Sequence, residues 1–371
     1  MLGSYYAMTV TKPEGQVTPA SLEVALAGKS LSLRGTTEFR SAGKPGRHHD
    51  NFETRRPAVT GDSVGLVVSL VLVAFGGDQF IVAIARLART LRLRPTLVGV
   101  FLGGFGTSIV ELIVAALAAA RHSPQLAVGS VVGSIAANVC LALAIAALIT
   151  PVRVGSATVR REAPLSVASV ALFAVLAIGG ISLAKGVVMA FALLPVLGLL
   201  LFSAHQRGPD PLGDEVIEFI EKPGSGPRPE VVRAVGSLVV MLGGADLMVN
   251  CAVGLAARLG MSQGFAGLTL VGIGTSAPLI ASSVQGARRG EHELVVGNVL
   301  GGNLFIALAG GALVGLLSNG RPGGTDALAL SFMVGAVVVS WLAMARRSVV
   351  SRWEALFLIV AYVVFLPFIN S

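Results

Sequence analysis

The sequence predicts an all-α integral membrane protein whose ten transmembrane helices form two five-helix repeats of inverted topology. Its composition excludes an ordinary water-soluble domain, because 54% of the 371 residues are hydrophobic, 13% are charged and the mean hydropathy is +0.79. The charged residues cluster between long uncharged runs, and each run is close to the ~20 residues that cross a bilayer as a helix. The third observation is an internal repeat with a constant offset of 168 residues.

Ten apolar runs mark the expected helices, and the polar stretches between them mark the loops. Residues 1–62 are polar and rich in Gly, Ser, Thr and Pro, and we expect a disordered N-terminal extension there. Residues 204–230 are also hydrophilic and form the expected linker between a first repeat at 63–203 and a second at 231–371. The predicted spans are 63–84, 95–119, 124–149, 163–182, 185–203, 231–256, 262–286, 293–317, 326–345 and 350–369.

The internal repeat joins two glycine-bracketed segments, GGFGTSIVELI at 103–113 and VGIGTSAPLIA at 271–281. The same offset pairs Asp78 with Asp246 without any gap. Five helices in each half is an odd number, so the second half enters the membrane from the opposite side and the halves are inverted. A repeat of this length in a membrane protein is typical of a transporter built from two homologous halves.

Basic residues in the loops predict how the chain lies in the membrane. Lys and Arg are concentrated in the segments 86–94, 153–161, 204–233, 288–289 and 346–352, and they are few in the other loops. The positive-inside rule therefore places these segments in the cytoplasm and both chain ends outside the plasma (inner) membrane. This asymmetry also accounts for the formal net charge of +8. We therefore expect a lipid bilayer around the protein and no nucleic acid partner.

Two apolar spans carry polar side chains that suit a cation. Thr107 and Ser108 precede Glu111 by four and three residues, so all three share one helix face. The next span repeats this spacing with Ser134 and Asn138. A carboxylate, hydroxyls and an amide form an all-oxygen set, which suits hard cations such as Na⁺ or Ca²⁺ better than softer metals. Glu111 and Asn138 are the expected metal ligands, because an ionisable group in mid-membrane marks an ion path by default.

Other interpretations of the polar and sulfur-bearing residues stay open at this point. Glu111 could instead be protonated and hydrogen-bonded within the bundle. For Asp78 and Asp246, a packing or hinge role is at least as well supported as ion contact. Cys140 and Cys251 fall within apolar spans, where buried free thiols are the default expectation.

The motifs around these residues resemble the two alpha repeats of the cation/calcium exchanger superfamily. Gly-Thr-Ser-x-x-Glu in the second span and Gly-Ser-x-x-x-Asn in the third resemble the first repeat, and the segments 243–246, 267–270, 274–276 and 297–301 resemble the second. The resemblance implies a mid-membrane cation site between helices 2, 3, 7 and 8, and alternating access as helices 1 and 6 move. It implies the ligand candidates Thr107, Ser108, Glu111, Ser134, Asn138, Thr275 and Ser276, with backbone carbonyls of Gly104 and Gly272.

The second repeat departs from the family pattern at its ligand positions. Leu279 stands where the family has glutamate, Gly302 where it has serine, and Ile306 where it has asparagine or aspartate. Calcium prefers six to eight oxygens, and one carboxylate balances a single monovalent charge. We therefore expect a sodium/calcium exchanger-type antiporter centred on Glu111, with altered ion selectivity or stoichiometry. It would carry Na⁺, H⁺ or, less simply, Ca²⁺, and would need no cofactor.

Two further classes of function compete with the antiporter. A non-transporting membrane sensor or scaffold that retains the exchanger fold is the alternative, because three ligand positions are lost together in the second repeat. A membrane-embedded enzyme is not expected, because the sequence has no metal-binding histidine cluster and no nucleophile paired with a base.

Overall fold

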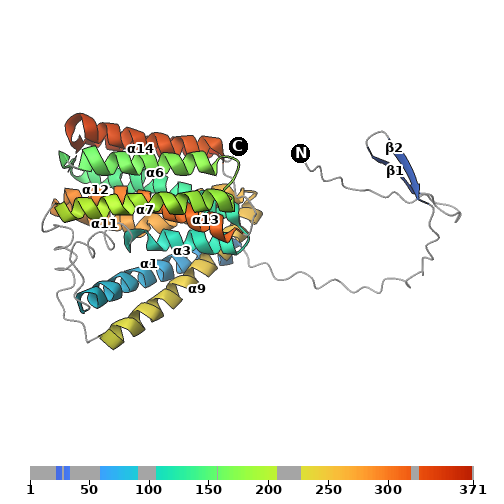
Figure 1. Ribbon diagram of the computed structural model, residues 1–371, viewed down its shortest axis with the longest axis horizontal. Helices are drawn as coiled ribbons and strands as arrows, with labels where there is room; N and C mark the ends of the chain where they lie inside the picture. Colours follow the sequence, from blue (N-terminus) through green and yellow to red (C-terminus); the bar gives the residue numbers. More distant parts are fainter. Residues whose placement is uncertain are drawn as a thin grey trace. The chain divides into compact units, whose positions relative to one another are not determined.

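The computed structural model describes residues 22–26, 29–33, 59–90, 106–156, 158–206, 227–318 and 326–369. The chain divides into two units, at Met1–Arg56 and Pro57–Ser371 (Figure 1). In the first, β1 (Leu22–Leu26) pairs antiparallel with β2 (Lys29–Leu33). This pair of strands lies within the segment for which the composition predicts a disordered extension, and the remainder of that segment up to residue 58 lies outside the described residues.

The second unit is almost entirely helical, as predicted. Several spans contain a π-helical segment, in which the backbone hydrogen bonds shift by one residue. In chain order the elements are α1 (Val59–Thr90), α3 (Thr107–Ala120), α4 (Pro124–Ala137), η2 (Asn138–Leu143), α5 (Ala144–Ile149), β3 (Val152–Arg153), η3 (Thr158–Glu162), α6 (Ala163–Ala177), α7 (Leu183–Gln206), α9 (Pro227–Leu259), α10 (Gln263–Ala266), η4 (Gly267–Val271), α11 (Gly272–Arg289), α12 (His292–Phe305), η5 (Ile306–Gly310), α13 (Gly311–Leu317), α14 (Ala327–Arg347), β4 (Val349–Val350) and α15 (Arg352–Ile369).

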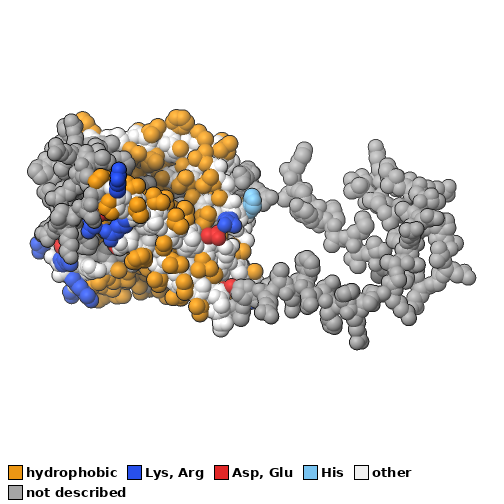
Figure 2. Space-filling model, turned by 90° about the horizontal axis from the view of Figure 1, so that it is seen from below, with side chains coloured by type: hydrophobic (Ala, Val, Ile, Leu, Met, Phe, Trp, Pro, Cys, Tyr) orange, Lys and Arg blue, Asp and Glu red, His pale blue; other side chains and the backbone are white. Residues whose placement is uncertain are grey.

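Eight helical segments among the described residues are long and apolar enough to cross a membrane. The predicted span 95–119 is described only from residue 106, and its remainder, Ser108–Ala120, is a shorter apolar helix. The predicted span 163–182 contains α6, which has 15 residues. The protein is therefore a multi-pass membrane protein, while the count of ten spans stays a prediction. Hydrophobic side chains form a broad band over the middle of the helical unit, and Lys and Arg gather toward one end (Figure 2).

Small residues allow α4 and the α10–η4–α11 segment to meet backbone to backbone. A Cβ atom added to Gly133 would overlap the carbonyl oxygen of Leu268, and one added to Gly267 would overlap that of Leu126. Close backbone approach at small residues is how helices pack in membranes, where no hydrophobic effect drives them together. The contact joins the two repeats at the centre of the bundle. It brings α4 of the first repeat against α11 of the second.

Helices α1 and α9 form an antiparallel pair at one edge of the unit (Figure 1). Asp62 at the start of α1 lies 2.8 Å from Nε of Arg258 at the end of α9. At the other end of the pair, Nη1 of Arg86 lies 3.2 Å from Oε1 of Glu230. Asp62 and Glu230 are related by the 168-residue offset, so the equivalent acidic position of each repeat pairs with an arginine of the other helix, although Arg86 and Arg258 are not themselves equivalent positions. The two repeats therefore run in opposite directions at this pair of helices.

The two cysteines are both buried and unpaired, which confirms the prediction of free thiols.

Candidate cation site

Glu111 is a buried carboxylate that forms no ion pair among the described residues of the helical unit. It lies one turn into α3, its side chain is 4% exposed, and its Oε2 atom has no hydrogen-bond partner among the described residues. Helix α3 packs against α4 of the first repeat and against α11 and α12 of the second. Both repeats therefore contribute to the surroundings of the carboxylate. A charged carboxylate in such surroundings is costly, by roughly 2.5–3.5 kcal/mol on membrane insertion scales. It therefore needs a bound cation or a proton.

A hydrogen bond between two amide side chains joins the two repeats inside the bundle. Asn138 begins η2 and donates from Nδ2 to Oδ1 of Asn303 on α12, over 3.1 Å. Both side chains are fully buried. The remaining amide atoms, Oδ1 of Asn138 and Nδ2 of Asn303, have no partner among the described residues. Because buried polar groups are normally hydrogen-bonded, Oδ1 of Asn138 is an acceptor oxygen available to a ligand.

A second hydrogen bond between the repeats joins two hydroxyl groups. Oγ of Ser134 on α4 lies 3.1 Å from Oγ1 of Thr275 on α11. Thr275 also donates to the carbonyl oxygen of Val271 over 3.0 Å, which leaves Ser134 as the donor to Thr275 when that bond is made. The next residue, Ser276, is fully buried, and its Oγ has no partner among the described residues. The sequence predicted Ser134, Thr275 and Ser276, and the structure places them on facing helices.

The other predicted ligands are Ser108, Thr107, Gly104 and Gly272. Ser108 is buried on α3 beside Glu111. Thr107 is the first residue of α3, and its side chain lies outside the described residues, as does Gly104 entirely. The carbonyl oxygen of Gly272 accepts a long hydrogen bond of 3.3 Å from Thr275. It is therefore at most partly available as a ligand.

Asn303 is a residue of this site that the ligand prediction missed. Its repeat equivalent is Ile135, so the offset gave no sign of a polar partner there. The available signal was its position in Gly301-Gly302-Asn303, the degenerate second motif of the second repeat. Because Asn138 and Asn303 bond across the repeat boundary, the amide of the second repeat stands beside the amide that the prediction placed in the first.

The two repeats also share a backbone feature at the site. The π-helical segment η2 begins at Asn138 and η5 begins at Ile306, which are repeat-equivalent positions. Such segments are frequently found at functional sites. The chemistry of the two differs, since Asn138 is an amide and Ile306 is a buried apolar side chain.

Other acidic groups are engaged elsewhere. Asp78 accepts a hydrogen bond of 2.9 Å from Gln79, and Asp246 pairs with Arg121 at 2.7 Å. At the position equivalent to Glu111, Leu279 is buried and apolar. Among the described residues, no group of three or more His, Cys, Asp or Glu side chains could hold a metal ion. The oxygen set around Glu111 therefore carries one carboxylate.

Comparison with known proteins agrees with this architecture. The family model for sodium/calcium exchanger protein matches residues 62–202 and 230–369, one stretch for each repeat. Inner membrane protein YrbG of Escherichia coli (strain K12) is 35% identical over 273 residues, which cover 72% of this chain and 82% of YrbG. Sodium/calcium exchanger MaX1 of Methanosarcina acetivorans is 24% identical over 339 residues, covering 81% of this chain and 96% of MaX1.

The fold is similar to solved structures of the sodium-calcium exchanger NCX_Mj. One of them, from a crystal soaked with Na⁺ and Sr²⁺, gives a TM-score of 0.56 at 26% identity and covers 84% of this chain and 99% of that one. MaX1 and NCX_Mj are sodium/calcium exchangers, and the chain is a cation transport protein of the membrane and not an enzyme. It belongs to the sodium/calcium exchanger protein family.

Proposed function

We propose that this protein is a secondary active cation antiporter whose transported ion binds at Glu111. The observation that carries the proposal is a set of buried oxygens without partners among the described residues. These are Oε2 of Glu111, Oδ1 of Asn138 and Oγ of Ser276. They come from three helices and from both repeats, and oxygen donors of this kind suit hard cations.

The single carboxylate favours a monovalent cation or a proton over calcium. Calcium takes six to eight oxygens and, in a dry site, more than one compensating negative charge. The repeat equivalents of Glu111 and Asn138 are Leu279 and Ile306, and both side chains are buried and apolar. The site can therefore balance less positive charge on its bound ions in each transport cycle than a site with a carboxylate from each repeat. We infer an altered ion selectivity or stoichiometry relative to exchange of Na⁺ for Ca²⁺.

The proposal includes alternating access between ten helices of inverted topology. The antiparallel pair of equivalent helices α1 and α9 supports that inversion. The gathering of basic side chains toward one end supports a cytoplasmic side there, with the 204–230 linker in the cytoplasm and the C-terminus outside (Figure 2). We place the protein in the inner membrane on the same charge asymmetry.

A second candidate is a membrane sensor or scaffold that keeps the fold and transports nothing. The observation that favours it is the apolar second half of the site, at Leu279, Gly302 and Ile306. The unpartnered oxygens count against it. Buried polar atoms of a purely structural protein would be expected to pair with one another.

Ion flux in proteoliposomes tests the proposal. The purified protein is reconstituted with imposed Na⁺ or H⁺ gradients, and uptake of ²²Na⁺ and ⁴⁵Ca²⁺ is followed beside proton movement. We expect gradient-driven Na⁺ or H⁺ flux that Glu111→Gln abolishes. The matched control is Glu354→Gln, because the Glu354 carboxylate on α15 accepts a hydrogen bond from the backbone N–H of Ser351 and is not one of the proposed ligands. Absence of flux for every cation would favour the scaffold, and Ca²⁺ uptake that depends on Glu111 would refute the selectivity argument.

A further inference from the structure

One ion pair at the end of the bundle is formed, whereas the equivalent ion pair of the other repeat is not. Arg121, at the C-terminal end of α3, places Nη2 2.7 Å from Oδ1 of Asp246 on α9. Both groups are partly exposed. Asp246 also accepts a long hydrogen bond, of 3.4 Å, from Asn250 one turn further along α9. The ion pair thus links α9 to the C-terminal end of α3, the helix that carries Glu111.

The 168-residue offset maps this ion pair onto two residues of the same charges. Arg121 corresponds to Arg289 at the end of α11, and Asp246 corresponds to Asp78 on α1. In the structure these two are not paired with each other. Asp78 accepts a hydrogen bond from Gln79, and Nη1 of Arg289 lies 4.0 Å from Oε1 of Glu291. The sequence thus contains the residues for two equivalent ion pairs. In the structure Arg121–Asp246 is formed and Arg289–Asp78 is not.

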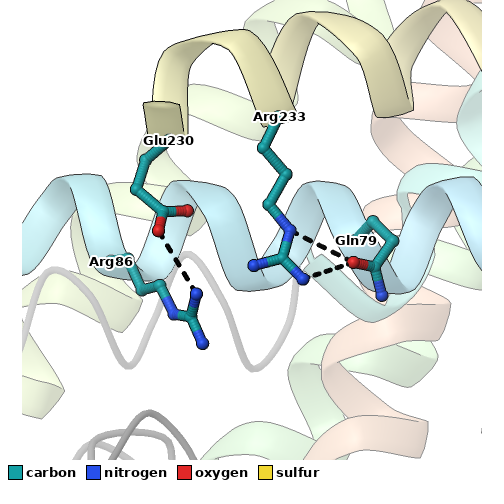
Figure 3. Close-up of polar contacts among 4 residues, drawn as sticks. All are labelled: Gln79, Arg86, Glu230 and Arg233. Carbon is teal, nitrogen blue, oxygen red and sulfur yellow. Dashed lines mark hydrogen bonds and ion pairs between the residues drawn. The ribbon is translucent and has the colours of Figure 1, made fainter. Parts of the chain in front are cut away.

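Helices α1 and α9 are fastened to each other, so they are expected to move together. Their two terminal ion pairs, Asp62–Arg258 and Arg86–Glu230, each contain a carboxylate that is nearly fully buried. Between them, the guanidinium of Arg233 on α9 donates twice to Oε1 of Gln79 on α1 (Figure 3). Figure 3 shows the Arg86–Glu230 and Arg233–Gln79 contacts between the two helices.

In a transporter built from inverted repeats, the second state is reached when the two halves exchange conformations. A contact made by one repeat in one state is then made by its equivalent in the other. When α9 leaves Arg121, the fastened pair carries α1 and Asp78 toward the end of α11. There Arg289 replaces the amide of Gln79 as the partner of Asp78. The exchange costs little, because both ion pairs are exposed and individually weak.

We propose that Arg121–Asp246 and Arg289–Asp78 are alternative ion pairs of one gate, formed at opposite ends of the protein in opposite states. The proposal rests on the alternating access of the proposed function. It assigns a role to four charged residues outside the cation site. It also accounts for the presence of like charges at equivalent positions of two repeats whose ligands have diverged.

Cross-linking in proteoliposomes tests the proposal. With both native cysteines replaced by alanine, one variant carries Arg121→Cys and Asp246→Cys, and a second carries Asp78→Cys and Arg289→Cys. A short bis-methanethiosulfonate reagent is used, because an ion pair holds backbones further apart than a disulfide does. The matched control for the second variant is Asp78→Cys with Arg288→Cys, since neighbouring helix residues point in directions about 100° apart. Yields are read by mass spectrometry in Na⁺, K⁺ and Ca²⁺ media.

We expect each variant to cross-link above its control, with the two yields changing in opposite directions between ion media. Each cross-link should stop exchange, and reduction should restore it. In the Asp78/Arg289 variant, removing the formed ion pair by Asp246→Asn should raise the yield, because the population shifts to the other state. The expected rise is roughly 1.4- to 5-fold, the range that exposed ion pairs support. Glu354→Gln should leave it unchanged.

The outcomes separate this proposal from the proposed function. If ions are exchanged and the Asp78/Arg289 variant cross-links no better than its control in any medium, the gate proposal is overturned and the antiporter stands. If no cation is exchanged but the two yields still change in opposite directions, the gate stands and the antiporter fails. Absence of both flux and the second cross-link overturns both.

Discussion

Neutralising Glu230 tests whether buried ion pairs hold α1 and α9 together. Glu230 is 3% exposed, and its partner Arg86 is 20% exposed. Removing one partner of a buried pair costs about 3–5 kcal/mol, because it leaves a charge in low-dielectric surroundings without compensation. Since Arg86 reaches some solvent, we expect Glu230→Gln to lower the free energy of unfolding by about 2–4 kcal/mol.

The assay can use the protein's own thiols. Cys140 and Cys251 are both buried, so a thiol-reactive dye in detergent reports unfolding as fluorescence when the bundle opens. Glu230→Gln should lower the melting temperature. Adding Arg86→Gln should recover part of the loss, because the double variant buries no unpaired charge. The double-mutant cycle then isolates the coupling energy of the pair.

The matched control is the exposed ion pair of the same helix. Asp246→Asn removes the partner of Arg121, where both side chains are about a third exposed or more, and should cost less than about 1 kcal/mol. The reasoning is refuted if Glu230→Gln destabilises the protein no more than Asp246→Asn does. It is also refuted if Arg86→Gln fails to recover any stability.

Three further predictions concern the site and its packing. Leu279→Glu should create ⁴⁵Ca²⁺ binding and uptake, because it supplies a second carboxylate at the equivalent position, whereas Leu279→Gln should not; a folded Leu279→Glu protein without Ca²⁺ binding would contradict the charge argument. Asn303→Leu should lower stability by about 1–3 kcal/mol, because Asn138 loses its buried partner, and should reduce flux; replacing both with Leu should restore the melting temperature and leave flux low. Gly133→Ala should destabilise by roughly 1–3 kcal/mol or more through backbone overlap, whereas Gly198→Ala, which meets no atom within 4 Å, should be neutral in the same melting assay.

The fold could be predicted largely because the bilayer restricts what can span it. Each crossing must bury its backbone polar groups within one helix, so length and hydropathy alone locate most spans. Eight of the predicted runs coincide with segments that are long and apolar enough. The π-helical segments could not be predicted, since a one-residue shift in hydrogen bonding leaves no mark in composition. Helix α6 begins where the predicted span begins but already ends at Ala177, because Ile178 leaves the helical conformation and Gly179 and Gly180 take positive φ.

Residues of the site could be predicted where a polar residue of one repeat has a polar equivalent 168 residues away in the other. Ser134 and Thr275 meet across the repeats, and Thr275 was found from its equivalent in the first half. Asn303 was missed because its equivalent is apolar. The ion pairs could not be predicted for another reason: in the sequence, Arg86 and Arg121 lie at the ends of apolar runs, where basic residues are expected to face the loops. Charge partners more than a hundred residues apart are fixed by packing, which sequence spacing does not encode.

The two repeats have diverged unequally, and the pattern bears on whether the protein transports. Ligand positions differ between the halves, with Glu111 opposite Leu279. The acidic positions of α1 and α9 that form ion pairs, or that are proposed to form them, are instead kept in both halves: Asp62 matches Glu230, and Asp78 matches Asp246. A rigid scaffold needs one stable arrangement of these charges, and the unformed contact of Asp78 would add nothing to it. A protein that alternates between two states needs both sets. The retained symmetry of the charges, set against the lost symmetry of the ligands, therefore argues for a working exchanger with a changed ion.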